Sequence, residues 1–383
     1  MEYFLTDEQN MLRKTVQNFL QNECTAEIIR EWDKEDKIPD RVLRKLKELG
    51  LTRLCIPKEY GGLGNNILDN VVVIEELAKA NMALAGHFIC YTFYGGEIIK
   101  ECGSLDQKRR FLPGVAKGEL FFSYGVTEPN AGSDATAVCT RAVPSGDKFI
   151  INGTKMFISG ADIADYVVTL TRTNEQGLRH KGLTLFVVDT KSEGYSCRPL
   201  EKLGGKGSNA CEVVYDNVVV PQTDILGGPE GLNKGWALLL KTLDLEHIEV
   251  AAFALGLAQA PFKESLEYVK FREQFVEPIG KYQAVSHRLA EMAVKIETAK
   301  LLVYNCAWLK VNNRPCMTEA CMAKLYTTEI CRDVAEVGMK IMGIDGYMMK
   351  NNMQRYLRDS LLGPIGGGTS EIQKNMIAKM LGL

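Results

Sequence analysis

Two segments of the chain bring together residue types that can hold a flat organic ligand. The first, Val126–Asp134, reads Val-Thr-Glu-Pro-Asn-Ala-Gly-Ser-Asp, and the second, Arg358–Ile372, ends in Gly-Gly-Gly-Thr-Ser-Glu-Ile. Glycine and other small residues allow main-chain amides to approach a ligand closely, and short hydroxyl side chains can bind its polar edge. The two segments therefore indicate the site of a flat cofactor.

Other kinds of catalytic site have little support in the sequence. No Gly-x-Gly-x-x-Gly turn opens a helix after a strand, and the glycine-rich stretch 57–64 lacks the Gly-Lys-Ser/Thr ending of a phosphate loop. A His-Glu-x-x-His pair is missing, and the four scattered histidines argue against a metal centre. No nucleophile elbow supports Ser-His-Asp hydrolysis, although the sequence alone leaves that chemistry open.

The composition bounds the class of protein. With 383 residues, 46% hydrophobic and 25% charged, the chain can form about two or three globular domains. The formal net charge is −2 and no Lys or Arg run forms a basic patch, so no nucleic-acid partner is expected. We find neither a secretion signal nor a bilayer-spanning apolar run, and therefore expect a cytoplasmic protein without an integral membrane segment. The eleven cysteines, lacking a Cys-x-x-Cys pair, are expected to be reduced thiols.

The period of the apolar residues changes twice along the chain, which suggests domains at residues 1–118, 119–228 and 229–383. In the first, Thr6 and Gln9 have capping-box spacing before a run of helical period, and the segment 67–85 repeats that period. Helical periodicity returns after the glycine-rich linker 227–231. There, one stripe of a long helix is formed by Val285, Leu289, Met292, Ile296 and Val303.

The middle segment is rich in β-branched residues and reads as strands. Strands are predicted at 166–171, 183–188 and 213–220, and Asn152-Gly153 between two β-prone runs predicts a hairpin. A small antiparallel barrel or sandwich fits this pattern. The expected fold class is α+β, with an N-terminal helical domain, a middle antiparallel β-barrel or sandwich, and a C-terminal helical bundle.

The first motif, Thr-Glu-Pro-x-Ala-Gly-Ser-Asp, resembles that of the acyl-CoA dehydrogenase family, and the resemblance covers essentially the whole chain. Further matches in family order are Tyr215-Asp216-Asn217-Val218, Arg272-x-Gln274-Phe275, Arg358-Asp359 and Gly368-Thr369-Ser370-Glu371-Ile372. The resemblance implies a C-terminal four-helix bundle, FAD between the β domain and that bundle, and a homotetramer. The implied reaction is the α,β-dehydrogenation of an acyl-CoA thioester, with electrons passed to an electron-transfer flavoprotein.

The resemblance also implies a set of FAD contacts. Those expected to face the flavin are Tyr124, Val126, Thr127, Ser133, Phe157 and Ser159. Arg272 and Phe275 are expected to reach the pyrophosphate and adenine of a neighbouring subunit's FAD, where Lys340 could meet a phosphate charge. Thr369 and Glu371 are expected near the adenosine. Phe157 and Ser159 stand where the family usually has Trp and Thr, so a stacking aromatic and a hydroxyl are kept. Ile344 stands where many relatives have glycine, and its side chain would crowd the FAD there. The alternative for Arg272 is a solvated charge on a helix without a cofactor contact.

The base of the implied reaction has to be found elsewhere than in most relatives. Removal of a weakly acidic α-proton needs a carboxylate of raised pKa in apolar surroundings, with donors for the thioester oxygen. Many relatives carry the base in a Tyr-Glu-Gly-Thr-Ser segment, which here reads Gly366-Gly367-Gly368-Thr369-Ser370. The N–H of Gly367 can still be an oxyanion donor, because that role uses the backbone. The run 243–247, Leu-Asp-Leu-Glu-His, resembles the isovaleryl-CoA branch of the family, which implies Glu246 as the base.

Three neighbours of Glu246 matter for this assignment. Glu249 is a rival base on the same helical face, and Asp244 matches a family aspartate expected to contact the CoA arm. His247 replaces the usual arginine and is expected to titrate near neutral pH. The alternative without a catalytic role is that Glu246 is an exposed carboxylate on a helix.

The glycines at 366 and 367 replace two large side chains of the acyl-pocket roof. We therefore expect a branched, cyclic or aryl-bearing acyl group, with Gly366 and Ser133 also beside the substrate. By position, the pocket floor falls near His87, Ile89 and Tyr94 together with the expected substrate contacts Cys90, Tyr91 and Thr92.

Two alternative functions stay open. The same scaffold could run in reverse as an enoyl-CoA reductase, because catalysis has no direction of its own. A family member without α-proton chemistry, such as a desulfinase-like lyase or a non-catalytic scaffold, would also account for the missing C-terminal glutamate.

Overall fold

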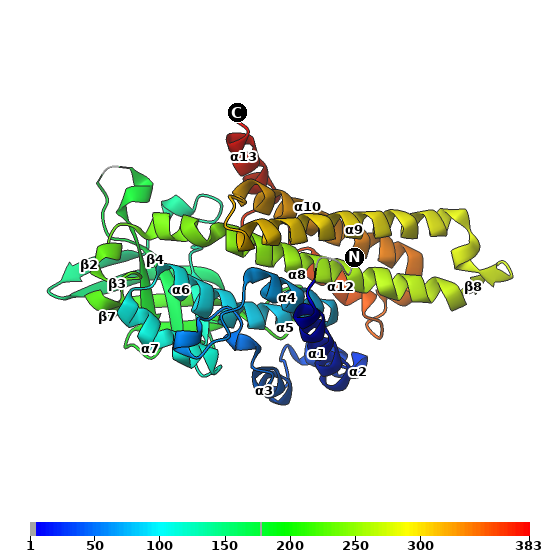
Figure 1. Ribbon diagram of the computed structural model, residues 1–383, viewed down its shortest axis with the longest axis horizontal. Helices are drawn as coiled ribbons and strands as arrows, with labels where there is room; N and C mark the ends of the chain where they lie inside the picture. Colours follow the sequence, from blue (N-terminus) through cyan, green and yellow to red (C-terminus); the bar gives the residue numbers. More distant parts are fainter. Residues whose placement is uncertain (1–4, 177) are drawn as a thin grey trace.

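The computed structural model describes residues 5–176 and 178–383. Helices form both ends of the chain and strands form its middle, as the sequence predicts. In Figure 1 the sheet occupies one end of an elongated molecule, and the C-terminal helices run along its length. Residues 1–4, part of the segment in which a secretion signal was sought, lie outside the described residues.

The N-terminal part is helical. Its α-helices and one π-helical segment are α1 (Asp7–Glu23), α2 (Ala26–Glu35), α3 (Asp40–Glu48), α4 (Ile67–Ala80), α5 (Met82–Ile89), η3 (Cys90–Glu97, π-helical), α6 (Ile98–Cys102) and α7 (Leu105–Ala116). Thr6 and Gln9 form the predicted capping box at the start of α1. The helical period predicted over 67–85 is confirmed, with a break at Asn81: its backbone is extended, and its Oδ1 accepts hydrogen bonds that cap α5.

The middle part is one curled seven-stranded sheet. Its strands are β1 (Phe122–Gly125), β2 (Arg141–Ser145), β3 (Lys148–Ser159), β4 (Tyr166–Arg172), β5 (Leu183–Asp189), β6 (Tyr195–Leu200) and β7 (Ala210–Pro221). Their order is β1-β4-β2-β3-β7-β6, with β5 paired to β4. The expectation of a purely antiparallel sheet needs correction, because β4 runs parallel to β1 and, at one residue pair, to β2.

The hairpin predicted at Asn152-Gly153 is also wrong. Both residues lie inside β3, at a register shift against β7, and the observed hairpin joins β2 to β3. A Cβ at Gly153 would lie 2.5 Å from Thr140 Oγ1, so this glycine permits a close backbone approach at a bulge. The dipeptide favours a turn locally, but β3 pairs with β2 on one edge and with β7 on the other, and this pairing keeps both residues within the strand.

The C-terminal part is built on one long helix. Its elements are α8 (Gly235–Phe271), the two-residue strands β8 (Glu273–Gln274) and β9 (Glu277–Pro278), α9 (Gln283–Val311), α10 (Met317–Met342), α11 (Ile344–Tyr347), α12 (Met353–Ser360) and α13 (Ser370–Met380). Helix α8 packs against α4, α9, α10 and α12, and α13 projects from the body with the C-terminus (Figure 1). Four members of the predicted α9 stripe, Leu289, Met292, Ile296 and Val303, are buried.

Membrane spans, metal ligands and disulfides can also be assessed for the described residues. None of their helices has the length and apolar character needed to cross a bilayer, and none of their His, Cys, Asp and Glu side chains gather in threes as metal ligands would. All eleven cysteines are free, and all but Cys139 and Cys197 are buried. The three domain boundaries and the cytoplasmic location stay predictions.

Candidate active site

Glu246 lies in the first half of α8, and its side chain is partly buried. Burial raises the pKa of its carboxyl to about 7, and the ammonium of Lys324 on α10 acts in the opposite direction. A carboxyl group with a pKa near neutrality is partly ionised near pH 7 and can accept a proton there, even where little water surrounds it. Its environment therefore suits proton abstraction better than that of an exposed helix carboxylate.

Two tyrosines from other elements lie close to Glu246. The rings of Tyr94 in η3 and Tyr124 in β1 are 5.5 Å apart. The pKa of each hydroxyl is raised, first by burial and also by the charge of Glu246. A π-helical segment, the first strand of the sheet and the long helix thus meet around one carboxyl group.

The glycine-rich loop before α13 lies over the same face of α8. A Cβ at Gly367 would be 3.5 Å from Val250, which follows Glu246 by one helical turn. Gly367 and Gly368 both have positive φ, at +61° and +80°. Within the described residues, the N–H of Gly367 has no hydrogen-bond partner. The loop therefore offers an unpaired main-chain donor near the turn of α8 that follows Glu246, and its three glycines carry no side chains.

Two residues that the sequence reasoning missed hold this loop. Lys324 Nζ donates to the carbonyls of Gly363 and Gly368, and Gln373 Nε2 donates to the carbonyl of Gly367 at 3.3 Å. Lys324 has no exposed surface. In the sequence, Lys324 falls at a core position of the helical period of α10. A lysine is rarely fully buried, so its occurrence at a core position was the signal that could have identified it.

The neighbours of Glu246 on α8 have different surroundings. Glu249 is buried and accepts a hydrogen bond from Asn70 Nδ2 at 3.0 Å, and burial raises its pKa to about 8. Asp244 Oδ2 forms a salt bridge with Lys310 Nζ at 2.6 Å, so the charge of this carboxylate is already paired within the chain.

His247 corrects a prediction. Burial, with a further contribution from Lys324, lowers the pKa of its ring to about 4. Its two nitrogens lie 3.6 Å from Cys321 Sγ and 3.3 Å from Gln373 Nε2. The expectation that it titrates near neutral pH is therefore wrong, because the ring is enclosed in the protein.

The segment expected to bind the flavin, Val126–Asp134, is held in place by a buried ion pair that the sequence did not reveal, Lys155 with Glu128. Lys155 Nζ donates to the carbonyl of Val126 at 3.0 Å and to Glu128 Oε1 at 2.8 Å. Glu128 also accepts from the main-chain N–H groups of Cys139 and Thr140. The Thr127 carbonyl accepts from Met156 N, which ties the motif to β3.

Phe157 has the features of a side chain kept for a ligand. It is 63% exposed, has φ of +63°, and lies at a register shift between β3 and β7. A bulky residue in this conformation is strained, and a bulge re-aims a side chain. Ser133 and Ser159 are exposed as well. These exposed groups fit the edge and face of a flat cofactor.

A second group of expected FAD contacts lies elsewhere. Arg272 and Phe275 stand at the far end of α8, beside the hairpin labelled β8 in Figure 1, and Phe275 is 86% exposed. Lys340 is exposed and pairs with Glu336. Thr369 caps α13, and Glu371 is exposed on its first turn. The structure does not bring Arg272 and Phe275 to Glu246, and their contact with a neighbouring subunit's cofactor stays a prediction.

The expected pocket floor is mostly enclosed. Cys90, Tyr91 and Thr92 are buried in η3. The Tyr91 hydroxyl donates to the Gly118 carbonyl at 3.5 Å, and that of Thr92 donates to the Phe88 carbonyl at 3.1 Å. Both hydroxyls are therefore already engaged, and their role as substrate contacts stays a prediction.

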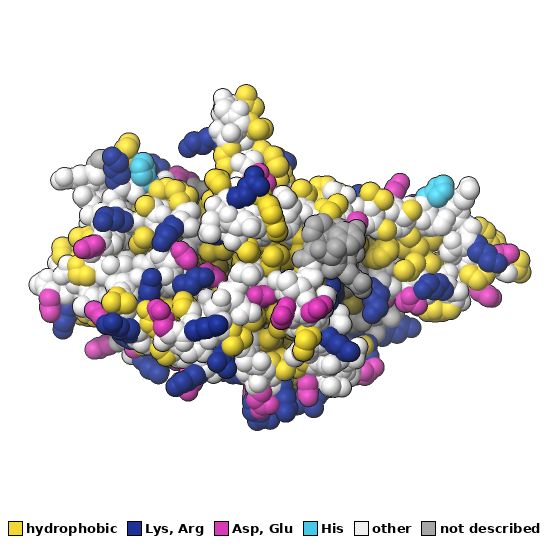
Figure 2. Space-filling model, viewed as in Figure 1, with side chains coloured by type: hydrophobic (Ala, Val, Ile, Leu, Met, Phe, Trp, Pro, Cys, Tyr) yellow, Lys and Arg dark blue, Asp and Glu magenta, His cyan; other side chains and the backbone are white. Residues whose placement is uncertain are grey.

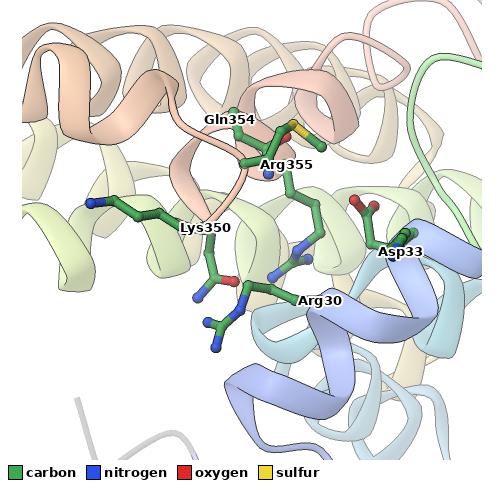
Figure 3. Close-up of a pocket in the computed structure, with 8 residues that line it drawn as sticks. Arg30, Asp33, Lys350, Gln354 and Arg355 are labelled. Carbon is green, nitrogen blue, oxygen red and sulfur yellow. The ribbon is translucent and has the colours of Figure 1, made fainter.

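A separate cavity of about 300 Å³ lies between α2 and the segment around the start of α12. Arg30, Asp33 and Arg355 are among its lining residues (Figure 3). Nearby, Arg358 pairs with Asp33 at 2.6 Å and joins α12 to α2. None of the candidate-site residues lines this cavity, and we assign its charges to the junction between the helices.

Comparison with known proteins identifies the family and the fold. Family models described as the N-terminal, middle and C-terminal domains of acyl-CoA dehydrogenase match residues 6–119, 123–218 and 233–382. The probable acyl-CoA dehydrogenase YngJ of Bacillus subtilis (strain 168) is 37% identical over 382 residues, covering 100% of both chains. The 3-(aryl)acrylate reductase of Clostridium sporogenes is 37% identical over 379 residues, covering 99% of both. The solved structure of butyryl-CoA dehydrogenase from Megasphaera elsdenii has a TM-score of 0.95 at 31% identity, with 100% of both chains covered.

The chain belongs to the acyl-CoA dehydrogenase family. It is an FAD-dependent oxidoreductase of that family's fold, with a helical N-terminal domain, a middle β domain and a helical C-terminal domain.

Proposed function

We propose that the protein dehydrogenates a branched, cyclic or aryl-bearing acyl-CoA to its 2-enoyl-CoA, with Glu246 as the base. One observation carries the proposal: burial raises the pKa of the Glu246 carboxyl to about 7, and Gly367, whose N–H has no partner among the described residues, lies against Val250 one turn further along α8. These two residues supply the groups that α-proton removal requires, a base and an oxyanion donor. This pairing also supports assignment to the branch with its glutamate on α8.

The residues of the chain would act in one step. Glu246 would take the α-proton of the thioester while the Gly367 N–H donates to the thioester oxygen, where negative charge develops. Bound FAD would accept the hydride that leaves the β-carbon. Phe157 and the hydroxyls of Ser133 and Ser159 would position the cofactor, and Tyr94 and Tyr124 would keep water from the base.

The substrate class follows from the roof of the site. Among the described residues, an added Cβ at Gly367 would meet only Val250 within 4 Å, and the three atoms nearest to one at Gly366 belong to Leu362, at 3.6 Å or more. Space beside the α- and β-carbons therefore supports a bulky acyl group. The test is turnover of matched butyryl-CoA, isovaleryl-CoA, cyclohexanoyl-CoA and 3-phenylpropionyl-CoA. Faster turnover of butyryl-CoA than of all three bulky substrates would contradict this part of the proposal.

The reverse reaction is the second candidate. The relative named 3-(aryl)acrylate reductase covers the full length of the chain, which supports an enoyl reductase with the same residues. Equilibrium constants do not depend on the enzyme, so the electron partner decides the direction. We propose an electron-transfer flavoprotein as that partner, and comparison of rates with its oxidised and reduced forms tests the direction. A chain that takes up FAD but turns over no thioester either way would favour the lyase or scaffold alternative.

We further propose a homotetramer. Three exposed apolar residues, Val294, Leu301 and Trp308, repeat at intervals of seven on α9, and Phe275 and Val276 extend this surface at the hairpin. Hydrophobic side chains also gather on α13 and along the arm formed by α8 and α9 (Figure 2). A second copy on this surface would explain how Arg272 reaches a cofactor. Light scattering that finds a monomer would contradict it.

A further inference from the structure

The loop that carries the proposed oxyanion donor has little rigidity of its own. It contains three consecutive glycines, Gly366–Gly368, and glycine populates many backbone conformations. A donor that stabilises developing charge must already be oriented when the charge forms. Two main-chain bonds, Gly366 N to Leu362 O and Ser370 N to Pro364 O, close the ends of the loop. Its centre must be fixed by groups outside it.

Lys324 supplies that fixation from α10. Its Nζ donates to the carbonyl of Gly363 at 3.1 Å and to that of Gly368, so one ammonium group spans both sides of the glycine run. Gln373 donates to the carbonyl between them, at Gly367. These bonds fix the carbonyls around the glycine run, whereas the N–H of Gly367 has no partner among the described residues and stays available as a donor.

The same ammonium group lies in the field of several charged groups. Glu246 and His247 face it from α8, Cys321 and Glu329 share its helix, and Glu371 approaches from α13. Burial lowers the pKa of Lys324 to about 8, and Glu246 acts against that shift. Its charge in turn favours the ionised form of Glu246.

We infer that Lys324 is a positioning residue that holds the loop carrying the Gly367 N–H and places its positive charge on the Glu246 side of that loop. The inference rests on the proposed function, since its two effects converge on the base and the donor. It assigns a catalytic consequence to a side chain that touches neither substrate nor cofactor.

The test compares Lys324→Met and Lys324→Gln with Lys379→Met, which removes an exposed lysine of α13. In the FAD-bound protein, hydrogen exchange at Gly366 N and Ser370 N should be at least about tenfold faster in Lys324→Met. Its kcat should fall about 10- to 100-fold, because a disordered donor is partly lost. The lower pKa of its kcat–pH profile should rise by about 1, since the cation that favours ionised Glu246 is gone.

Lys324→Gln separates the two effects and serves if the methionine variant does not fold. The amide can still donate to a carbonyl but carries no charge, so the pH profile should shift while exchange and kcat change less. Normal exchange and an unshifted pH profile in a folded Lys324 variant would overturn the inference. A parent enzyme inactive with every acyl-CoA would count against the proposed function instead, while the exchange measurement would still decide whether Lys324 holds the loop.

Discussion

Glu246→Gln should make the protein more stable and much less active at the same time. Burial raises the pKa of Glu246 from 4.5 to about 7, so the folded state holds this proton more tightly than the unfolded chain does. Stability must therefore fall as pH rises from about 4.5 to about 7, and above that range the full cost of burying the charge is present. The difference between the two pKa values corresponds to about 3 kcal/mol, and glutamine, which does not ionise, escapes this cost.

The assay is urea unfolding of the FAD-bound protein at two pH values, with kcat measured in parallel. At about pH 8 Glu246→Gln should be about 2 to 3 kcal/mol more stable than the parent, and at about pH 5 the difference should shrink below about 1 kcal/mol. The kcat should fall by about 10²- to 10⁴-fold, the usual contribution of a general base. Glu193→Gln, at an exposed turn before β6, is the matched control and should change neither quantity. Equal stability at both pH values with undiminished turnover would refute Glu246 as a buried base.

Three further changes test other parts of the site. In Glu249→Gln the hydrogen bond from Asn70 can persist, and because burial raises the pKa of Glu249 to about 8 the parent side chain is already mostly neutral near pH 7. Its kcat should stay within about threefold of the parent, and a loss above about 100-fold would make Glu249 the base. Phe157→Ala removes a stacking contact of about 1 kcal/mol, so flavin absorbance per chain after dialysis should report about fivefold weaker retention of FAD; unchanged retention would remove Phe157 from the cofactor site. Lys155→Met leaves the buried Glu128 without its ammonium partner and should lower the free energy of unfolding by about 3 to 5 kcal/mol, with partial recovery on adding Glu128→Gln. A loss below about 1 kcal/mol in urea unfolding would contradict this role of the pair.

The sequence by itself determined the order of helical, β and helical parts, the family, and the segments that the proposed site uses. Capping residues such as Thr6 and the apolar stripe of α9 act locally, within one or two helical turns, and both were predicted correctly. The family motif at Thr127–Asp134 is local in the same sense. Such features can be recognised because their physical cause lies in neighbouring residues.

Tertiary structure decided what depends on residues far apart in the chain. Asn152-Gly153 has the local chemistry of a turn, but β7 and Thr140 make it a bulge. His247 is neutral because α10 and α13 enclose it, an effect that no neighbour in sequence produces.

The same holds for the pKa of Glu246, which comes from the desolvation that several packed elements impose. The helical period of α10 puts Lys324 at a core position, but it does not show which groups the ammonium contacts. Only the folded chain places its ammonium group between the carbonyls of Gly363 and Gly368, because a hydrogen bond across about 40 residues depends on the packing of α10 against the loop. The sequence thus determined which groups are available for the reaction, whereas packing determined their charge and orientation.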